Sequence, residues 1–255
     1  MQQGEESSSR FWEFYALRYS VGAVLGAIIL FFLVQKNKAL SALIFVKPGE
    51  PIDLVQVGIF FGVGLVYSYL ASAPILVLHA GRFSIPKGPL PFLSIERISS
   101  AIRVVVCANL ALIFSLVSSV EGLPKIWFSA VVFLACNVLI SQIVIVVKCV
   151  LQRDKLYYFY RDLAKKRKDA SGGLVDSYRH LREHGNAFGI VLCEIILGIF
   201  MFAAPAYMSF VSPGNYQDIY SVMGILTVVV MLWITPASLV WLVGTIIERE
   251  FVDSY

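Results

Sequence analysis

The chain has 255 residues, of which 58% are hydrophobic and 15% are charged, and its formal net charge is +4. Soluble domains are about 45–50% apolar and about 25% charged, so this composition excludes an ordinary soluble domain. The apolar residues gather in runs of roughly 20, the length that an α-helix needs to cross the hydrocarbon core of a bilayer. These runs do not alternate as barrel strands do, and they therefore predict an all-α membrane protein.

The sequence predicts a polytopic helical bundle with about six transmembrane helices. In chain order these spans cover roughly residues 15–34, 54–78, 98–120, 126–147, 186–208 and 223–246. Gly22 and Gly26 in the first span, and Gly58 and Gly62 in the second, have a spacing that permits close approach of two helices. Pro74 predicts a kink in the second span, because proline cannot donate to the helical ladder.

The only long polar segment, residues 148–185, separates the fourth and fifth spans. It carries ten of the 21 Lys and Arg residues against five acids. The turn at 170–173 ends in two glycines, so the segment is predicted to be a helical hairpin whose first limb continues the fourth span beyond the bilayer. Apolar residues recur at three- and four-residue spacings on both limbs, and the two limbs are predicted to bury these faces together. They are Leu156, Tyr160 and Leu163 on the first limb and Leu174, Tyr178 and Leu181 on the second.

The distribution of Lys and Arg predicts the orientation in the membrane. Seventeen of the 21 fall on the side of the hairpin and of both termini, and four fall on the other side. Because cytoplasmic loops carry an excess of Lys and Arg, the hairpin and both termini are predicted to be cytosolic, in a cell inner (plasma) membrane. The predicted organisation is a polar segment at 1–14, four spans within 15–147, the hairpin at 148–185, two spans within 186–246 and a tail at 247–255.

Glu194 is the most informative polar residue of the predicted spans. It lies eight residues into the fifth span, about 12 Å below the cytosolic boundary at 1.5 Å per residue. An acid at that depth usually faces a bundle interior, a partner or a water path. Arg103 enters the third span from the same side and is predicted to pair with it, while Asn109, Asn137 and Gln142 are predicted to join spans three to five. The cluster is interpreted either as an ion or proton path with a gate, or as interhelical bonds that hold the bundle.

The run Lys165, Lys166, Arg167 and Lys168 is predicted to lie at the far tip of the hairpin. This position suits a cytosolic protein partner with an acidic surface, and a nucleic-acid ligand is also open. The alternative is that these charges serve only solvation and topology, as positive cytosolic loops commonly do.

His180, Glu183 and His184 match the H-x-x-E-H signature of inverted zinc proteases. A zinc site needs a further protein ligand. The next acid, Glu194, is ten residues beyond His184, about 15 Å along a continuous helix. The motif is therefore interpreted as part of a solvated, basic helix, and neither a metal nor another cofactor is expected.

These features together predict a non-enzymatic multi-pass membrane effector, channel-like or regulatory subunit without catalytic residues. It is expected to form homo-oligomers in the lipid bilayer, with the basic hairpin sensing or docking a partner. Three alternatives remain open at this point: a proton-linked small-solute transporter that uses Glu194, a membrane metalloenzyme at the H-x-x-E-H motif, and a membrane scaffold subunit.

Overall fold

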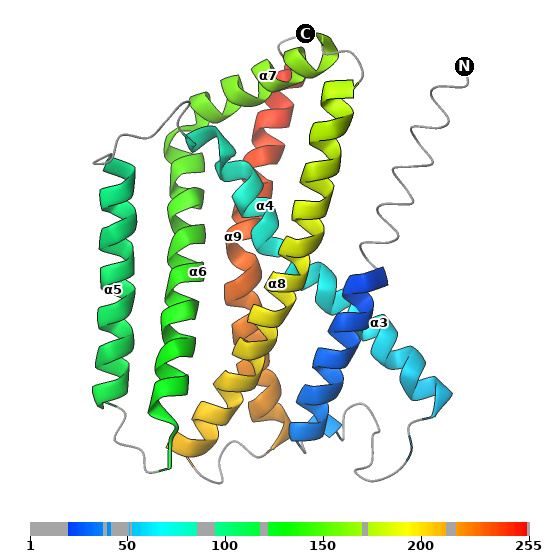
Figure 1. The fold of residues 1–255 in the computed structure, drawn as a ribbon, viewed down its shortest axis with the longest axis vertical. Helices are drawn as coiled ribbons and strands as arrows, with labels where there is room; N and C mark the ends of the chain where they lie inside the picture. Colours follow the sequence, from blue (N-terminus) through cyan, green and yellow to red (C-terminus); the bar gives the residue numbers. More distant parts are fainter. Residues whose placement is uncertain are drawn as a thin grey trace.

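The computed structural model describes residues 20–37, 40–41, 51, 53–85, 95–117, 122–169, 173–212 and 218–253, and within these ranges every regular element is a helix. Long helices stand side by side as a bundle (Figure 1). After an initial helix, Ser20–Lys36, the elements are α3 (Leu54–Ala71), α4 (Ala73–Ala80), the 3-10 helix η1 (Gly81–Ser84), α5 (Ile95–Val117), α6 (Lys125–Leu151), α7 (Arg153–Asp169), α8 (Gly173–Val211) and α9 (Ile219–Asp253).

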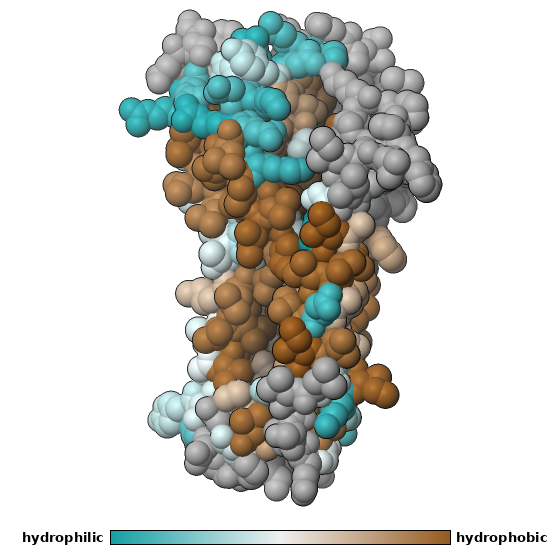
Figure 2. Space-filling view, turned by 90° about the vertical axis from the view of Figure 1, so that its left-hand side faces the viewer, coloured by the Kyte–Doolittle hydropathy of each residue, from teal (hydrophilic) through white to brown (hydrophobic). Residues whose placement is uncertain are grey.

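Four of the predicted spans are long and apolar enough to cross a membrane. They are Leu54–Ser84, Lys125–Leu151, Gly185–Val211 and Ile219–Glu250, which confirms the second, fourth, fifth and sixth predicted spans. Within the described residues, the first and third predicted spans contain shorter apolar stretches of helix, Ser20–Lys36 and, inside α5, Ser99–Ser115. Figure 2 shows hydrophobic side chains along the middle of one face of the molecule, with hydrophilic side chains gathered mainly toward its upper end.

Side-chain caps start α3 and α9. Asp53 accepts a hydrogen bond from the Gln56 N–H at 2.7 Å, and Gln56 Oε1 accepts one from the Asp53 N–H at 3.0 Å, which makes a capping box. Asp218 accepts bonds from the Ser221 hydroxyl at 2.7 Å and from its N–H at 2.9 Å, just before α9. These Ser221 bonds hold the pKa of the Asp218 carboxyl below its usual value.

Glycines bring the helix Ser20–Lys36 into backbone contact with α3. A Cβ added to Gly64 would lie 2.5 Å from the carbonyl oxygen of Ala23 and 2.6 Å from the nitrogen of Ala27. A Cβ added to Gly26 would lie 2.5 Å from the carbonyl oxygen of Gly64. The predicted close approach at the first glycine spacing is therefore confirmed, since only hydrogen fits at both positions.

The second glycine spacing makes no such contact with the described residues. A Cβ added to Gly58 or to Gly62 meets no atom within 4 Å. Phe61 and Val63, their neighbours on α3, are exposed. The first half of α3 therefore presents an apolar surface to its surroundings, as a helix in contact with lipid does.

Pro74 divides the second predicted span into α3 and α4, as its sequence position indicates. The Ile75 N–H would bond to the Ala71 carbonyl in a regular α-helix, but it bonds to the Ser72 carbonyl at 2.9 Å. The Ala71 carbonyl accepts a hydrogen bond from Trp233 Nε1 of α9 at 3.1 Å instead. A side chain 162 positions away thus satisfies a buried backbone group at the break.

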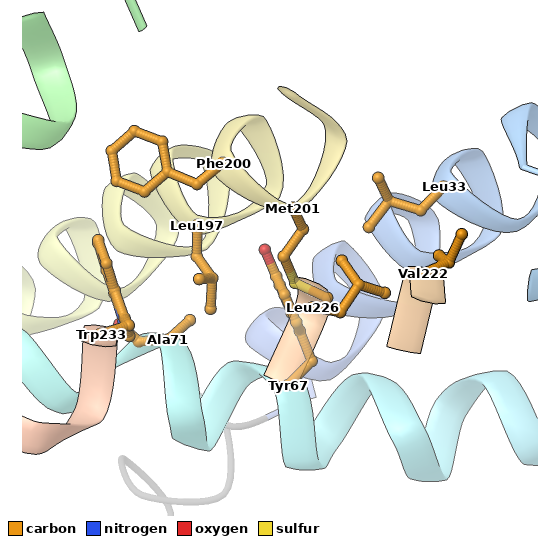
Figure 3. Close-up of a cluster of buried hydrophobic side chains, with 9 residues drawn as sticks. All are labelled: Leu33, Tyr67, Ala71, Leu197, Phe200, Met201, Val222, Leu226 and Trp233. Atoms are coloured by element: carbon orange, nitrogen blue, oxygen red, sulfur yellow. The ribbon is translucent and has the colours of Figure 1, made fainter. Parts of the chain in front are cut away.

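The main core lies where the initial helix, α3, α8 and α9 meet (Figure 3). The rings of Phe200 and Trp233 pack edge to face within it, with centroids 5.8 Å apart. Its nine buried side chains are Leu33, Tyr67, Ala71, Leu197, Phe200, Met201, Val222, Leu226 and Trp233.

The predicted continuation of the fourth span into the hairpin is wrong at Gln152. This residue adopts φ −117° and ψ 38°, outside the helical region, so α6 ends at Leu151. The following helix, α7, crosses the end of the bundle at an angle (Figure 1). Leu156 is buried in one cluster with Val77 of α4 and Cys149 of α6, so the first limb turns this apolar side chain toward the bundle.

The backbone of the second limb is helical, as predicted. One uninterrupted helix, α8, runs for 39 residues from Gly173 to Val211 and contains both the second limb and the fifth span. It passes through Gly185 and Pro205 without ending. The side chains of residues 173–184, including Tyr178, lie outside the described part of the structure.

Candidate functional site

Glu194 lies at the crossing of the initial helix, α3 and α8, and its exposed fraction is 0%. A Cβ added to Gly22 would lie 2.2 Å from Ser68 Oγ and 2.7 Å from Glu194 Oε1, so these two oxygens are neighbours behind Gly22. Within the described ranges, neither Glu194 oxygen nor Ser68 Oγ has a hydrogen-bond partner. Three buried oxygen atoms without partners among the described residues therefore gather at one point of the bundle.

Tyr67 fixes the backbone of α8 at the same level. Its hydroxyl donates to the Glu194 carbonyl at 2.5 Å in a buried contact. Gly198, one turn further along α8, leaves room for this phenol, since a Cβ there would lie 3.2 Å from the Tyr67 hydroxyl oxygen. Consecutive residues of α3 thus hold the main chain of residue 194 and face its side chain.

Sequence reasoning did not find Tyr67 or Ser68. One tyrosine and one serine in an apolar run carry no signal by themselves, because both occur in lipid-facing and in buried positions. The glycine spacing in the first span and the acid in the fifth were both recognised. The order of the spans along the chain does not predict that the glycines and the acid meet beside α3, because this depends on how the helices pack.

Arg103 does not form the predicted ion pair with Glu194. Its Nη1 donates to Ser141 Oγ of α6 at 3.1 Å. The physical reason is the place of α5, which lies at the edge of the bundle with α6 between it and α8 (Figure 1). A short connection makes the third and fourth predicted spans neighbours, and the long guanidinium side chain reaches the nearer helix.

The predicted interhelical bonds of the two asparagines are also wrong. Asn109 donates to the Val105 carbonyl at 2.7 Å and Asn137 to the Phe133 carbonyl at 2.9 Å, each four residues back on its own helix. Gln142 is buried on α6, and its amide atoms have no partner among the described residues. Of the predicted intramembrane polar group, Glu194 is thus the member at the three-helix crossing.

A second set of polar contacts fastens the helices at the end of the bundle where α7 lies. His79 Nε2 of α4 lies 3.0 Å from Asn186 Oδ1 of α8, and the Tyr160 hydroxyl of α7 donates to the His79 carbonyl at 3.2 Å. Arg153 of α7 forms an ion pair with Glu250 of α9. Helix α7 is thereby tied to α4 and α9, beside a cavity of about 310 Å³ whose lining includes residues of α4, α6, α7 and α9.

The predicted docking residues lie toward the end of α7. Lys165 and Lys166 are exposed, and Lys166 Nζ lies 2.8 Å from Asp162 Oδ2, one turn back. The side chains of Arg167 and Lys168 lie outside the described residues. The predicted docking role remains a prediction, and the described part of the run is a solvated, basic helix surface.

The side chains of His180, Glu183 and His184 fall outside the described part of α8, so the H-x-x-E-H motif remains a sequence pattern. Among the residues that are described, no three His, Cys, Asp or Glu side chains gather closely enough to hold a metal ion.

Comparison with protein-family models, with curated proteins and with solved structures finds no match. The lengths and hydropathies of the helices indicate a multi-pass membrane protein. Within that class the distinguishing features are the buried carboxyl of Glu194 and the continuous helix α8, which joins it to the second limb of the predicted hairpin. Compartment, orientation, oligomeric state and partner remain predictions.

Proposed function

We propose that this chain is a non-enzymatic regulatory or effector protein of the plasma membrane whose basic arm, the predicted hairpin at residues 148–185, docks a cytosolic partner with an acidic surface. Docking then shifts the bundle between two arrangements. The observation that carries this proposal is the continuity of α8, which joins the second half of the basic arm to Glu194 without a break. A displacement of the basic arm therefore reaches the crossing with α3, because an unbroken helix transmits movement along its axis.

The first half of the basic arm has its own connections to the bundle. Tyr160 contacts the main chain of α4, and Arg153 pairs with Glu250 of α9. Helix α4 follows the interruption at Ser72 and Pro74, where the chain can bend with little loss of hydrogen bonding. A partner bound to the basic arm would thus act on α4, α8 and α9 together, and the break between α3 and α4 is the hinge.

The proposal is tested by neutralising the tip charges Lys165, Lys166, Arg167 and Lys168 to Gln together. Polyglutamate serves as the acidic probe, with the full chain in nanodiscs of zwitterionic lipid. We expect its affinity to fall about tenfold or more, since 1.4 kcal/mol is a factor of ten and each charge contributes a fraction of that. Spin labels at Leu76 on α4 and Phe188 on α8 should report a distance change when polyglutamate binds the unaltered arm, and none in the neutralised variant.

The matched control neutralises four charges that the charge count places on the opposite side of the membrane, namely Lys36, Lys38, Lys47 and Lys125. Its affinity for polyglutamate should be unchanged. Equal binding by the tip variant and the wild type would remove the docking proposal. An oligonucleotide that binds more tightly than polyglutamate would replace the acidic protein partner with a nucleic acid.

A proton-linked small-solute transporter is the second candidate, favoured by the burial of Glu194 without a hydrogen-bonded or ionic partner within the described ranges. In proteoliposomes with an entrapped pH dye and an imposed potassium diffusion potential, this candidate predicts proton flux that the Glu194→Gln variant loses. Flux that persists in that variant, or its absence from the wild type, would eliminate it.

A further inference from the structure

An ionised Glu194 carboxylate at this crossing needs a positive group, which the described residues do not supply. An ionised carboxylate taken out of water without a partner is far more costly than a neutral carboxylic acid. Glu194 is fully buried, and Arg103, its predicted partner, bonds to Ser141 instead. Within the part of the chain that the structure describes, no side chain compensates the charge of an ionised Glu194, which leaves a bound species or a proton to do so.

Among the described residues, the groups that face Glu194 from the surrounding helices carry no positive charge. The initial helix presents Gly22, which has no side chain, and α3 presents Ser68 and the phenol of Tyr67. On α8 the neighbouring titratable group is the thiol of Cys193. Ionisation of the phenol or of the thiol would add a second negative charge to the crossing, so neither can offset the first.

We propose that the Glu194 carboxyl binds one exchangeable proton, occluded behind Gly22 between the initial helix, α3 and α8. The size of the oxygen set favours a proton over a metal ion, since Ca²⁺ takes six to eight oxygen ligands and Mg²⁺ takes six, whereas three unpartnered oxygens gather here. A protonated carboxyl also becomes a hydrogen-bond donor, and Ser68 Oγ is the adjacent acceptor. One proton thereby gives partners to two of the three orphaned oxygens.

The site has a built-in consequence for the bundle. Loss of the proton leaves a charge among apolar side chains, and the charge is relieved when water enters between α8 and its neighbours. Water can enter only if the close contacts of Tyr67 and Gly22 with residue 194 separate. The proton therefore stabilises the closed crossing. This inference goes beyond docking and stands without it, since it needs only the three helices.

Infrared spectroscopy of the full chain in nanodiscs tests the proposal. At neutral pH the wild type should show the carbonyl band of a protonated carboxylic acid, and transfer to heavy water should shift it slowly. The Glu194→Gln variant should lack the band, while Glu248→Gln, at an exposed acid of α9, should keep it. Ser68→Ala should keep the band and move it to higher frequency, because the acid loses its acceptor.

Several outcomes would overturn the proton site. They are the absence of the band from the wild type, its persistence in Glu194→Gln, and its loss when sodium or calcium ions are added, which would assign the oxygens to a cation. The Ser68→Ala measurement keeps the test decisive if Glu194→Gln fails to fold, because an unshifted band would place the protonated acid elsewhere. Polyglutamate binding plays no part in this experiment, so failure of docking and failure of the proton site are distinguishable.

Discussion

Replacing Gly64 by alanine is expected to lower the free energy of unfolding of the bundle by about 1–3 kcal/mol, the usual cost of forcing an extra methyl group into a packed contact. The atoms that the methyl group would meet are the Ala23 carbonyl oxygen at 2.5 Å and the Ala27 nitrogen at 2.6 Å. Both belong to the backbone of another helix and cannot turn aside as a side chain would. The initial helix must therefore move away from α3, and the contact of Gly22 with Ser68 and Glu194 loosens with it.

Gly62→Ala is the matched control for this substitution. Gly62 lies two residues earlier on the same helix, and an added Cβ there meets nothing within 4 Å. Both substitutions carry the same intrinsic gain in helix propensity, up to about 1 kcal/mol, so their difference isolates the clash. Thermal unfolding in detergent, followed by circular dichroism, gives the comparison. Equal transition temperatures for the two variants would show that the two helices do not meet at Gly64.

The two glycine spacings also show what a sequence of this kind can predict. Gly22 and Gly26, and likewise Gly58 and Gly62, have the same small-residue pattern, yet in the part of the chain that the structure describes only the first pair lies against another helix. The glycine pattern indicates that another helix can come close to this backbone. Whether a helix does so depends on the surface of the neighbouring helix. Composition and run length were enough to predict a helical membrane protein and four of its spans, because these depend on local hydropathy alone.

Which helices pack against one another was harder to predict than where the helices lie in the sequence. The pairing of Arg103 with Glu194 assumed that the third and fifth spans touch, but α6 lies between them (Figure 1). The break at Gln152 had no signal either, since neither glycine nor proline lies near it. It follows from the burial of Leu156, which turns α7 across the end of the bundle to cover apolar side chains of α4 and α6.

Trp233→Phe is expected to destabilise the bundle by about 1–3 kcal/mol, even though the replacement is aromatic and apolar. The indole N–H of Trp233 donates a hydrogen bond to the Ala71 carbonyl at the break between α3 and α4. Without it a buried carbonyl loses its bond and water cannot reach it, which costs about that amount. The smaller phenyl ring also leaves a void beside Phe200.

Trp241→Phe is the appropriate comparison, because Trp241 lies two turns further along α9 and is 66% exposed. Its substitution should change the unfolding temperature little, and subtracting it removes the general effect of exchanging indole for phenyl. A lower unfolding temperature for Trp233→Phe alone would show that α9 stabilises the break between α3 and α4. Equal and small effects of both substitutions would mean that the Ala71 carbonyl finds another donor, and that the break does not depend on α9.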